Sequence, residues 1–267
     1  MKDIKKKWII VTGVNGLLGS TIKTELLKNG FGVIGIGRRE TLTKNNDSFK
    51  YFKCDVSNIR QIKKFYKDIS SFNLLGLVNN AGIQGPIGCF MENEMSEWIN
   101  SINSNLIGPV MMTQEFIKLK NKNAYIVNIS GGGATKPMEY FSSYAAAKTA
   151  LVRFTETLSI ELEQFNTKTI AIAPGFLPSN FHTPILNESV NIPKKVSDQI
   201  KLKFNKPDKP EFASKLICDF ILGRFDNLNG KLISAIFDKK IIKNVEEKSD
   251  VGMLRRIDNQ FYFKGDK

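Results

Sequence analysis

Short apolar runs alternate along the chain with segments in which apolar residues recur every three or four positions. Uninterrupted runs of strand length are typical of a parallel sheet buried on both faces, and the spaced pattern is typical of amphipathic helices. Their alternation predicts an α/β fold in which helices cross over between parallel strands. The predicted strands are 8–11, 31–36, 51–54, 74–78, 124–129, 169–173 and 231–237, and the predicted helices are 17–27, 59–69, 95–120, 144–165, 197–204 and 210–221.

Capping residues predict where several of these helices begin and end. Gly30 lies where a C-terminal cap is expected, and Ser57 is a plausible N-cap for the second helix. Ser96 is expected to cap the third helix, which continues past Pro109. We expect a kink there because proline cannot donate the helical hydrogen bond.

One long stretch departs from the alternating pattern. Residues 176–209 are rich in Pro, Asn and Lys, and an irregular segment of this length within a compact domain is usually a lid or binding loop. Residues 241–267 form a charged tail after the last predicted strand. No repeat or convincing linker divides the chain, so the sequence predicts one domain over 1–267.

The composition is that of an ordinary globular protein, since 42% of the 267 residues are hydrophobic and 24% are charged. No apolar run approaches the roughly 18 residues of a membrane span. The N-terminal segment is a poor secretion signal, so we expect no membrane partner and a cytoplasmic location. Cys54, Cys89 and Cys218 lack CxxC or Cys/His spacing, which argues against a disulfide framework and against a metal site.

The net charge of +13 raises the question of a nucleic-acid partner. The lysines, however, are spread along the whole length, without a basic helix or a recognisable nucleic-acid motif. We therefore expect no nucleic-acid partner.

The first predicted strand is followed directly by a glycine-rich turn and an amphipathic helix, in the segment Thr12-Gly13-Val14-Asn15-Gly16-Leu17-Leu18-Gly19. Glycines at such a turn let the backbone approach a pyrophosphate, which binds at the positive N-terminus of the helix. The order predicts a dinucleotide site, although a tight turn without a ligand has the same pattern. The residues expected to contact the coenzyme here are Gly13, Asn15, Gly16, Leu17, Leu18 and Gly19.

The segment after the second strand distinguishes NAD from NADP. An acidic residue there would bind the ribose 2′-hydroxyl, whereas arginine would accept a 2′-phosphate. Arg38 and Arg39 stand at this place, and a guanidinium suits a phosphate dianion, so we expect NADP, with NAD as the alternative. One of the two arginines could instead be a solvated surface charge. Asp55, after the third strand, either hydrogen-bonds an adenine amine or caps the following helix.

Tyr144 and Lys148 place a phenol and an ammonium one turn apart on the same helical face. An unperturbed tyrosine has a pKa of about 10. The lysine cation and the positive ring of an oxidised nicotinamide would lower the pKa of Tyr144. Its hydroxyl could then exchange a proton with a carbonyl or an alcohol near neutral pH. Helices also contain this spacing by chance, with the tyrosine half-buried and the lysine solvated.

The motifs together resemble the short-chain dehydrogenase/reductase family, in its shorter, single-domain branch, over about residues 7–237. The resemblance implies a doubly wound Rossmann fold of about seven parallel strands with helices on both faces. It also implies that the coenzyme and active site share this domain, with the substrate under a loop. The motifs that carry it, in chain order, are the glycine-rich turn, Asn79-Asn80-Ala81-Gly82, Asn105, Ser130, Tyr144 with Lys148, and Pro174-Gly175.

The resemblance also implies a role for each of these positions. Tyr144 would be the general acid/base, and Lys148 would bind the nicotinamide ribose and lower the pKa of Tyr144. Asn105 would hold a water in the proton relay, unless it only accompanies the helix kink near Pro109. The remaining expected coenzyme contacts are Val56, Asn80, Ala81, Gly82, Pro174, Gly175 and Leu177, of which the backbone near the last would meet the carboxamide.

Two departures from the family pattern bear on function. The glycine spacing TGxxGxxG is closer to the nucleotide-sugar-modifying branch than to the TGxxxGxG of the shorter members. The substrate-orienting serine usually precedes the tyrosine by 12 or 13 residues, but Gly131 stands 13 residues before Tyr144 and Ser130 stands 14 before. Ser130 is our candidate for this role; Ser142 or Ser143 could substitute, or the role could be vacant.

The predicted lid mixes a few aromatic residues with polar ones, which favours a polar substrate such as a sugar or a sugar nucleotide. His182, the one histidine, is more often a surface or hinge residue than a base in such a position. The first hypothesis is an NADP-dependent oxidoreductase that interconverts a ketone and an alcohol. The alternatives are a sugar-nucleotide epimerase or dehydratase that retains its coenzyme, and a non-catalytic nucleotide-binding protein, which Gly131 motivates.

The resemblance further implies a homodimer or homotetramer formed through the long helices at 95–120 and 144–165.

Overall fold

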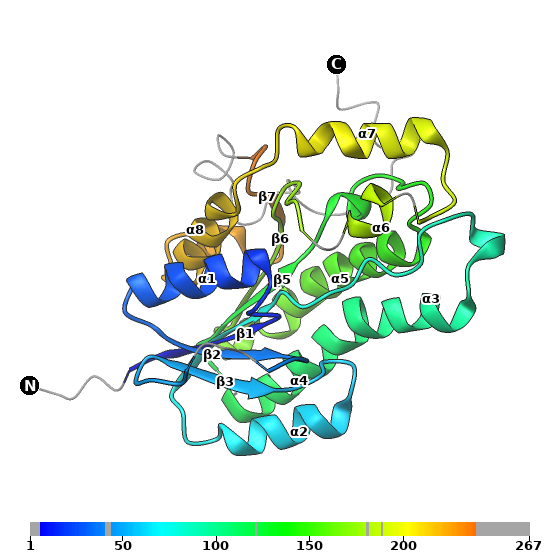
Figure 1. The fold of residues 1–267 in the computed structure, drawn as a ribbon. Coiled ribbons are helices and arrows are strands. Elements are labelled where there is room, and N and C mark those ends of the chain that lie inside the picture. The colour runs from blue at the N-terminus through cyan, green and yellow to red at the C-terminus, as the bar shows by residue number, and fades with distance from the viewer. Residues whose placement is uncertain (1–5, 41–43, 121, 180–181, 188, 239–267) are drawn as a thin grey trace, which may run out of the picture.

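A seven-stranded parallel sheet lies at the centre of the computed structural model, which describes residues 6–40, 44–120, 122–179, 182–187 and 189–238 (Figure 1). The strand order is β3-β2-β1-β4-β5-β6-β7, and every neighbouring pair is parallel. The parallel α/β fold that the alternating pattern predicts is therefore confirmed, and so is the doubly wound sheet of seven strands that the family resemblance implies. The strands are β1 (Trp8–Thr12), β2 (Gly32–Gly37), β3 (Phe49–Lys53), β4 (Leu74–Asn79), β5 (Tyr125–Ile129), β6 (Lys168–Ala173) and β7 (Leu232–Ser234).

Helices cover both faces of this sheet because successive strand residues point to opposite sides. Ile9 and Val11 of β1 pack toward α1 and α8, whereas Trp8 and Ile10 pack toward α2, α4 and α5 (Figure 1). Both sets are buried, which explains why the strands are apolar throughout. The helices are α1 (Leu17–Lys28), α2 (Ile59–Asp68), α3 (Met95–Ile102), α4 (Gly108–Lys120), α5 (Ser142–Glu161), α6 (Thr183–Leu186), α7 (Lys194–Phe204) and α8 (Pro210–Ile221).

The strand order reverses direction between β1 and β4. The chain runs from β1 outward through β2 to β3, and then returns to place β4 on the other side of β1. In open α/β sheets, ligands bind in the crevice at the carboxyl ends of the strands at such a point. The glycine-rich turn that follows β1 and the segment 79–82 that ends β4 both lie at this crevice.

The helix predicted at 95–120 is not a single regular α-helix. It is divided into α3, a π-helical turn (Asn103–Ile107) and α4. Pro109 is the second residue of α4, which follows this π turn directly, and the helix continues from α3 through the π turn into α4. Proline and π turns are both common causes of a helix kink, so the kink expected at Pro109 stays a prediction. The N-cap is Glu94 rather than Ser96, which lies inside the first turn of α3.

Two further boundaries were predicted wrongly for identifiable reasons. Asn58, not Ser57, caps α2, because its side-chain oxygen accepts the backbone N–H groups of Arg60 and Gln61 at 3.0 and 3.2 Å. The last strand ends at Ser234, whereas the apolar run continues to residue 237. The Ser234 hydroxyl accepts the N–H groups of the two residues at 236 and 237 and turns the chain away from the sheet.

The predicted lid, 176–209, contains two helices. The structure begins α7 at Lys194, three residues before the predicted 197, and adds the short α6, which the sequence pattern did not predict. The charged tail at 241–267 lies outside the described residues.

Candidate active site

The glycine-rich turn is held against the end of β4 by polar contacts. The Thr12 hydroxyl accepts the backbone N–H groups of Asn80 and Ala81, both at 2.8 Å. The Asn80 side-chain amide donates in return to the carbonyl oxygens of Thr12 and Gly13, at 2.9 and 3.2 Å. Gly13 has a φ of +64°, and a Cβ there would lie 3.0 Å from the Cα of Ala81. The close approach of the two loops therefore requires glycine at this position.

The N-terminus of α1 is open at this turn. Asn15, Gly16 and Leu17 are exposed, whereas Leu18 and Gly19 are buried. Gly16 is the N-cap and offers no side chain to the first N–H groups of the helix, which have no intrahelical partner. These N–H groups and the helix dipole form a site that suits a pyrophosphate. This part of the chain therefore fits the coenzyme that the sequence predicts.

Two exposed guanidinium groups, of Arg38 and Arg39, follow β2 directly. The Tyr51 hydroxyl of β3 donates a hydrogen bond to the carbonyl oxygen of Arg39 and accepts one from the Asn15 amide at 3.4 Å. Tyr51 thus links the glycine-rich turn to the segment that carries the arginines. Sequence reasoning did not select Tyr51, because only the pairing of β2 with β3 brings it there.

Asp55 and Val56 follow β3 at the same edge of the sheet. Asp55 accepts the N–H and the hydroxyl of Ser57 at 2.9 and 2.8 Å, which forms a local turn. The alternative that Asp55 caps α2 is wrong, since Asn58 provides that cap. The Val56 carbonyl faces Gly108, where a Cβ would lie 2.8 Å from it.

Tyr144 and Lys148 lie on the inner face of α5, where Tyr144 is half-buried and Lys148 is 4% exposed. The Lys148 ammonium lies 5.7 Å from the centre of the Tyr144 ring and donates to the carbonyl oxygen of Ile129 at 2.8 Å. Burial lowers the pKa of Lys148 to about 8 and raises the pKa of Tyr144 to about 12. Without a coenzyme, desolvation therefore outweighs any stabilisation of the phenolate by the lysine.

Gly131 lies directly against the catalytic candidate Tyr144. A Cβ on Gly131 would overlap the Tyr144 hydroxyl, so this residue cannot gain a side chain without moving the phenol. Ser130 is buried, and its hydroxyl has no hydrogen-bond partner among the described residues. The Ser143 hydroxyl is in the same situation, whereas Ser142 accepts the indole N–H of Trp98 at 3.0 Å. Ser130 and Ser143 therefore keep a free hydroxyl, and Ser142 does not.

Asn105 lies in the π turn between α3 and α4 and is completely buried. Its amide donates to the carbonyl oxygens of Ile83 and Ser101 at 2.7 and 3.0 Å, and its side-chain oxygen accepts the N–H of Ile83 at 3.2 Å. A Cβ on Gly82 would lie 2.6 Å from that oxygen and 3.7 Å from the Lys148 ammonium. The structure thus brings Gly82, Asn105 and Lys148 together.

A buried polar chain supports these elements from below. The Asn79 amide donates to Asn128 and to Thr113 at 2.9 and 3.1 Å, and the Asn128 amide donates to the Thr155 hydroxyl at 2.9 Å. The chain joins β4, α4, β5 and α5, the elements that carry the segments around the site. Such hydrogen bonds between buried groups are costly to break, so they hold the strand ends in one arrangement.

The turn after β6 contains Pro174, Gly175 and Leu177. Gly175 has a φ of +95°, and a Cβ there would lie 2.6 Å from a carboxylate oxygen of Asp208. That oxygen accepts the backbone N–H of Phe176 at 2.7 Å. Asp208 is the second residue that sequence reasoning missed, because it lies at the far end of the lid.

His182 belongs to an aromatic cluster in the lid. Its ring lies 4.7 Å from the ring of Phe176 and 5.4 Å from that of Phe204. Burial lowers the pKa of His182 below its ordinary value, the Ser179 backbone opposes this shift, and the Lys203 cation adds a smaller lowering. The half-buried imidazole packs against the two phenylalanine rings at tilted and edge-on angles, and this packing does not assign it the role of a base.

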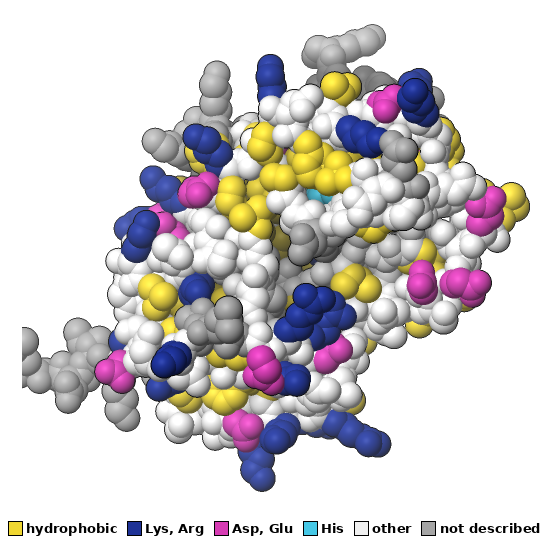
Figure 2. Space-filling model, viewed as in Figure 1, with side chains coloured by type: hydrophobic (Ala, Val, Ile, Leu, Met, Phe, Trp, Pro, Cys, Tyr) yellow, Lys and Arg dark blue, Asp and Glu magenta, His cyan; other side chains and the backbone are white. Residues whose placement is uncertain are grey.

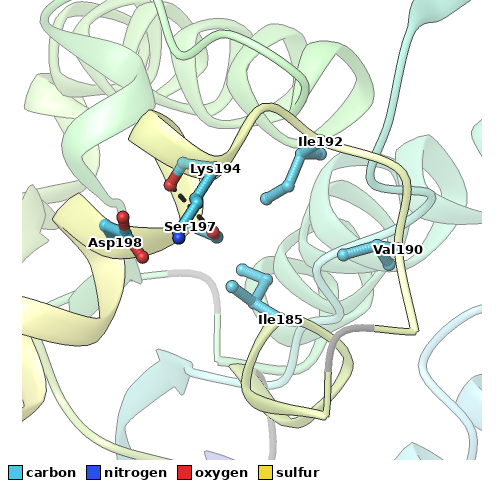
Figure 3. A pocket seen from close by; sticks show the side chains of 6 residues that line it. All are labelled: Ile185, Val190, Ile192, Lys194, Ser197 and Asp198. Carbon is cyan, nitrogen blue, oxygen red and sulfur yellow. Dashed lines mark hydrogen bonds between the residues drawn. The ribbon is translucent and has the colours of Figure 1, made fainter.

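Between α6 and α7 lies a cavity of about 380 Å³ (Figure 3). Ile185, Val190 and Ile192 form one side of it, and Lys194, Ser197 and Asp198 at the start of α7 form the other (Figure 3). In the face that Figure 2 shows, hydrophobic side chains gather between α7 and α8, while Lys and Arg side chains are scattered across that face. Both surfaces belong to the lid and its immediate surroundings.

Residues 7–189 match the protein-family description "short chain dehydrogenase". This match covers most of the chain, which therefore belongs to the short chain dehydrogenase family, a family of oxidoreductases that act on ketones and alcohols with NAD or NADP.

Among curated proteins, the chain is 27% identical to the benzil reductase ((S)-benzoin forming) of Bacillus cereus, over 79% of this chain and 92% of that protein. It is 29% identical to the sorbitol-6-phosphate 2-dehydrogenase of Klebsiella pneumoniae, over 82% of this chain and 89% of that protein. Some relatives are longer: the chain is 30% identical to mouse estradiol 17-beta-dehydrogenase 2 over 80% of this chain, but spans only 58% of that protein.

Solved structures show the same fold. A variant of the actinorhodin polyketide ketoreductase with NADPH matches with a TM-score of 0.76 at 22% identity, over 86% of this chain and 95% of that one. ElxO with NADP bound matches with a TM-score of 0.73 at 23% identity, over 87% of this chain and 97% of that one. Within the part of the chain that the structure describes, no helix is long and apolar enough to cross a membrane.

Proposed function

We propose that this protein is an NADP-dependent oxidoreductase that interconverts a ketone and a secondary alcohol on a polar small molecule, with Tyr144 as its general acid/base. The observation that carries this proposal is the position of Tyr144. Its hydroxyl lies against Gly131 and its ring lies beside the buried Lys148. Both residues face the crevice where the glycine-rich turn meets the end of β4. A titratable hydroxyl in such a crevice, next to a site that fits a pyrophosphate, suits proton exchange with a reacting carbonyl.

The coenzyme preference is argued from the end of β2. Arg38 and Arg39 are exposed there, and no acidic residue at 37 or 38 is available to bind a ribose 2′-hydroxyl. A guanidinium pairs well with a phosphate dianion, which favours NADP. The solved relatives with NADPH and NADP are consistent with this choice.

The bound nicotinamide would supply or accept the hydride. Tyr144 would donate its proton to the substrate oxygen during reduction, and its raised pKa of about 12 keeps the hydroxyl protonated until then. Lys148, with a pKa of about 8, is charged at neutral pH and would offset the charge left on the phenolate. The free hydroxyl of Ser130 would orient the substrate oxygen, and Asn105 would hold a water of the proton relay at the π turn.

The substrate class is inferred from the lid and from one relative. Lys194, Ser197 and Asp198 provide polar groups at the lid cavity. Sorbitol-6-phosphate 2-dehydrogenase shares most of its length with this chain. Both favour a sugar or a sugar derivative as substrate. We also expect a homodimer or homotetramer, formed through the helical regions 95–120 and 144–165.

The test is a panel of oxidised sugars and small ketones, assayed by the absorbance of NADPH and of NADH. We expect consumption of NADPH with a preference over NADH of about tenfold or more, and loss of that preference when both arginines are replaced by alanine. A tenfold preference for NADH would refute the arginine argument.

Two other results would replace the proposed reaction. A tightly retained nucleotide without net NADPH consumption would indicate an epimerase or dehydratase. Binding of NADPH with no turnover that depends on Tyr144 would indicate a nucleotide-binding protein without this chemistry.

A further inference from the structure

The two ends of the lid are joined by a pair of reciprocal hydrogen bonds. The Asp208 carboxylate accepts the backbone N–H of Phe176 at 2.7 Å, and the backbone N–H of Asp208 donates to the Phe176 carbonyl oxygen at 3.0 Å. The two residues are 32 positions apart, and they bracket the predicted lid almost completely. The side chain of one residue therefore fixes the backbone at which the lid leaves β6.

The glycine that precedes Phe176 is required for this contact. Gly175 has a φ of +95°, which other residues rarely adopt. A Cβ at Gly175 would lie 2.6 Å from the accepting carboxylate oxygen and 2.9 Å from the Cβ of Asp208. The turn at 174–177 and the Asp208 side chain thus fit together only because residue 175 has no side chain.

Asp208 itself is attached to a rigid part of the molecule. α8 begins two residues later, at Pro210, and its residues Ala213 and Ile217 are buried in the same core cluster as Ile22 of α1. The far end of the lid adds a second contact to the turn, because the ring of Phe204 packs edge-on against that of Phe176 at 5.1 Å. The turn after β6 is therefore held from the α8 side as well as from its own strand.

We propose that Asp208 is a positioning residue for the nicotinamide end of the coenzyme. From just before α8 it fixes the turn at 174–177, and through that turn it acts on the binding of the coenzyme. This inference rests on the proposed function, and on the expectation from the family resemblance that the backbone near Leu177 meets the carboxamide. Asp208 acts through the turn and is not assigned a contact with the reacting atoms.

The test compares two ligands that differ by the nicotinamide half. NADPH reaches both ends of the crevice, whereas 2′,5′-ADP carries the adenosine with its 2′-phosphate and lacks the nicotinamide. In the full chain, Asp208→Ala is expected to weaken NADPH binding about tenfold, the effect of losing a hydrogen bond to a charged group. Binding of 2′,5′-ADP should stay within about twofold, since distant sites are nearly additive. Calorimetry measures both dissociation constants.

Two variants control for the charge and for the hydrogen bond. Asp208→Asn keeps an oxygen that can accept the Phe176 N–H, so it should retain most of the NADPH affinity. Asp68→Ala removes an exposed carboxylate at the end of α2 and should change neither ligand's binding. If Asp208→Ala does not fold, Asp208→Glu, whose extra methylene displaces the carboxylate, is measured instead and should show the same difference between the ligands.

The outcomes separate this inference from the proposed function. Equal loss of both ligands, or loss of neither, in Asp208→Ala would overturn the positioning role while the wild-type protein still binds NADPH. A wild-type chain that binds neither NADPH nor 2′,5′-ADP would overturn the proposed function, and this inference with it.

Discussion

The two ends of the proposed coenzyme site are built in different ways. At the adenosine end, the glycine-rich turn is held by Thr12 and Asn80, which stand at the ends of neighbouring strands and bond each other's backbones. At the nicotinamide end, the turn after β6 is held by Asp208, across the whole lid. The first arrangement follows directly from forming the sheet. The second also requires the lid to fold back, so it is more sensitive to changes in the lid.

The catalytic candidates lie between these two ends and depend on buried groups. The Asn79–Asn128–Thr155 chain fixes the ends of β4 and β5 against α5. Tyr144 and Lys148 extend from α5 toward the crevice, so their geometry is set by the core rather than by the lid. Substitutions at the adenosine end, at the nicotinamide end and among the catalytic candidates should therefore have separable effects on binding, on chemistry and on stability.

The largest effect is expected from Tyr144→Phe. The variant removes only the hydroxyl, and general acid–base groups contribute about 10²- to 10⁴-fold, so kcat should fall about a thousandfold. Dissociation constants for NADPH and for 2′,5′-ADP should be nearly unchanged, because neither end of the site is altered. Steady-state kinetics and calorimetry measure the two quantities. Weakened binding of both ligands with an unchanged kcat would contradict the separation described above.

Lys148 predicts a specific dependence of stability on pH. Its pKa is lowered by burial to about 8 in the folded chain, against its ordinary 10.5 in the unfolded chain. Between these values the unfolded state holds more protons at this lysine, so Lys148 contributes a rise of the free energy of unfolding with pH, by about 3 kcal/mol in total. Burial raises the pKa of Cys54, Cys218 and Tyr144, so the two thiols oppose this rise above their ordinary pKa of 9.0 and the phenol opposes it above 10.0.

The measurement is urea unfolding of the coenzyme-free protein between pH 7 and 10, compared with Lys148→Met. The variant lacks the titrating group and should lose this rise, while gaining stability near neutral pH relative to the wild type. Parallel pH profiles of the two proteins would show that burial does not lower the pKa of Lys148 in the folded chain.

In the family pattern, a serine stands 12 or 13 residues before the tyrosine, and this chain has Gly131 at the second of these positions. Replacing Gly131 by serine should lower activity rather than raise it. In Gly131→Ser the new Cβ overlaps the Tyr144 hydroxyl, and overpacking of this kind costs about 1–3 kcal/mol, so kcat should fall about tenfold to a hundredfold. Gly132→Ser is the matched control, because a Cβ there meets nothing within 4 Å. A gain of activity in Gly131→Ser would show that the phenol can move aside and that the orienting role was vacant.

The smallest effect is expected from Tyr51→Phe at the adenosine end. The change removes the hydrogen bond to the Arg39 carbonyl, worth about 0.5–1.5 kcal/mol, so 2′,5′-ADP and NADPH should both bind about fivefold more weakly. NADH, which lacks the 2′-phosphate, should be affected less. If the binding of NADPH and of NADH weakens equally, Tyr51 supports the fold in general and does not act through the segment that carries Arg38 and Arg39.

The order of the elements and most of the local chemistry could be predicted from the amino-acid sequence alone. Apolar runs such as 8–11 predicted strands, because a strand buried on both faces cannot alternate with polar residues. The glycine-rich turn and the Tyr144–Lys148 spacing were visible because their functional geometry is contained within one turn or one helix. The parallel sheet and the family followed from these local signals.

Contacts between residues far apart in the sequence could not be predicted in this way, because they depend on how the whole chain folds. Tyr51 reaches Arg39 because β2 pairs with β3, and Asp208 reaches Phe176 because the lid folds back, and neither contact has a signal in the local pattern. The π turn around Asn105 likewise has no signal in the local pattern. Whether the pKa of Tyr144 is raised or lowered also depends on the fold. The spacing to Lys148 is local, but the burial that raises this pKa is set by the whole chain.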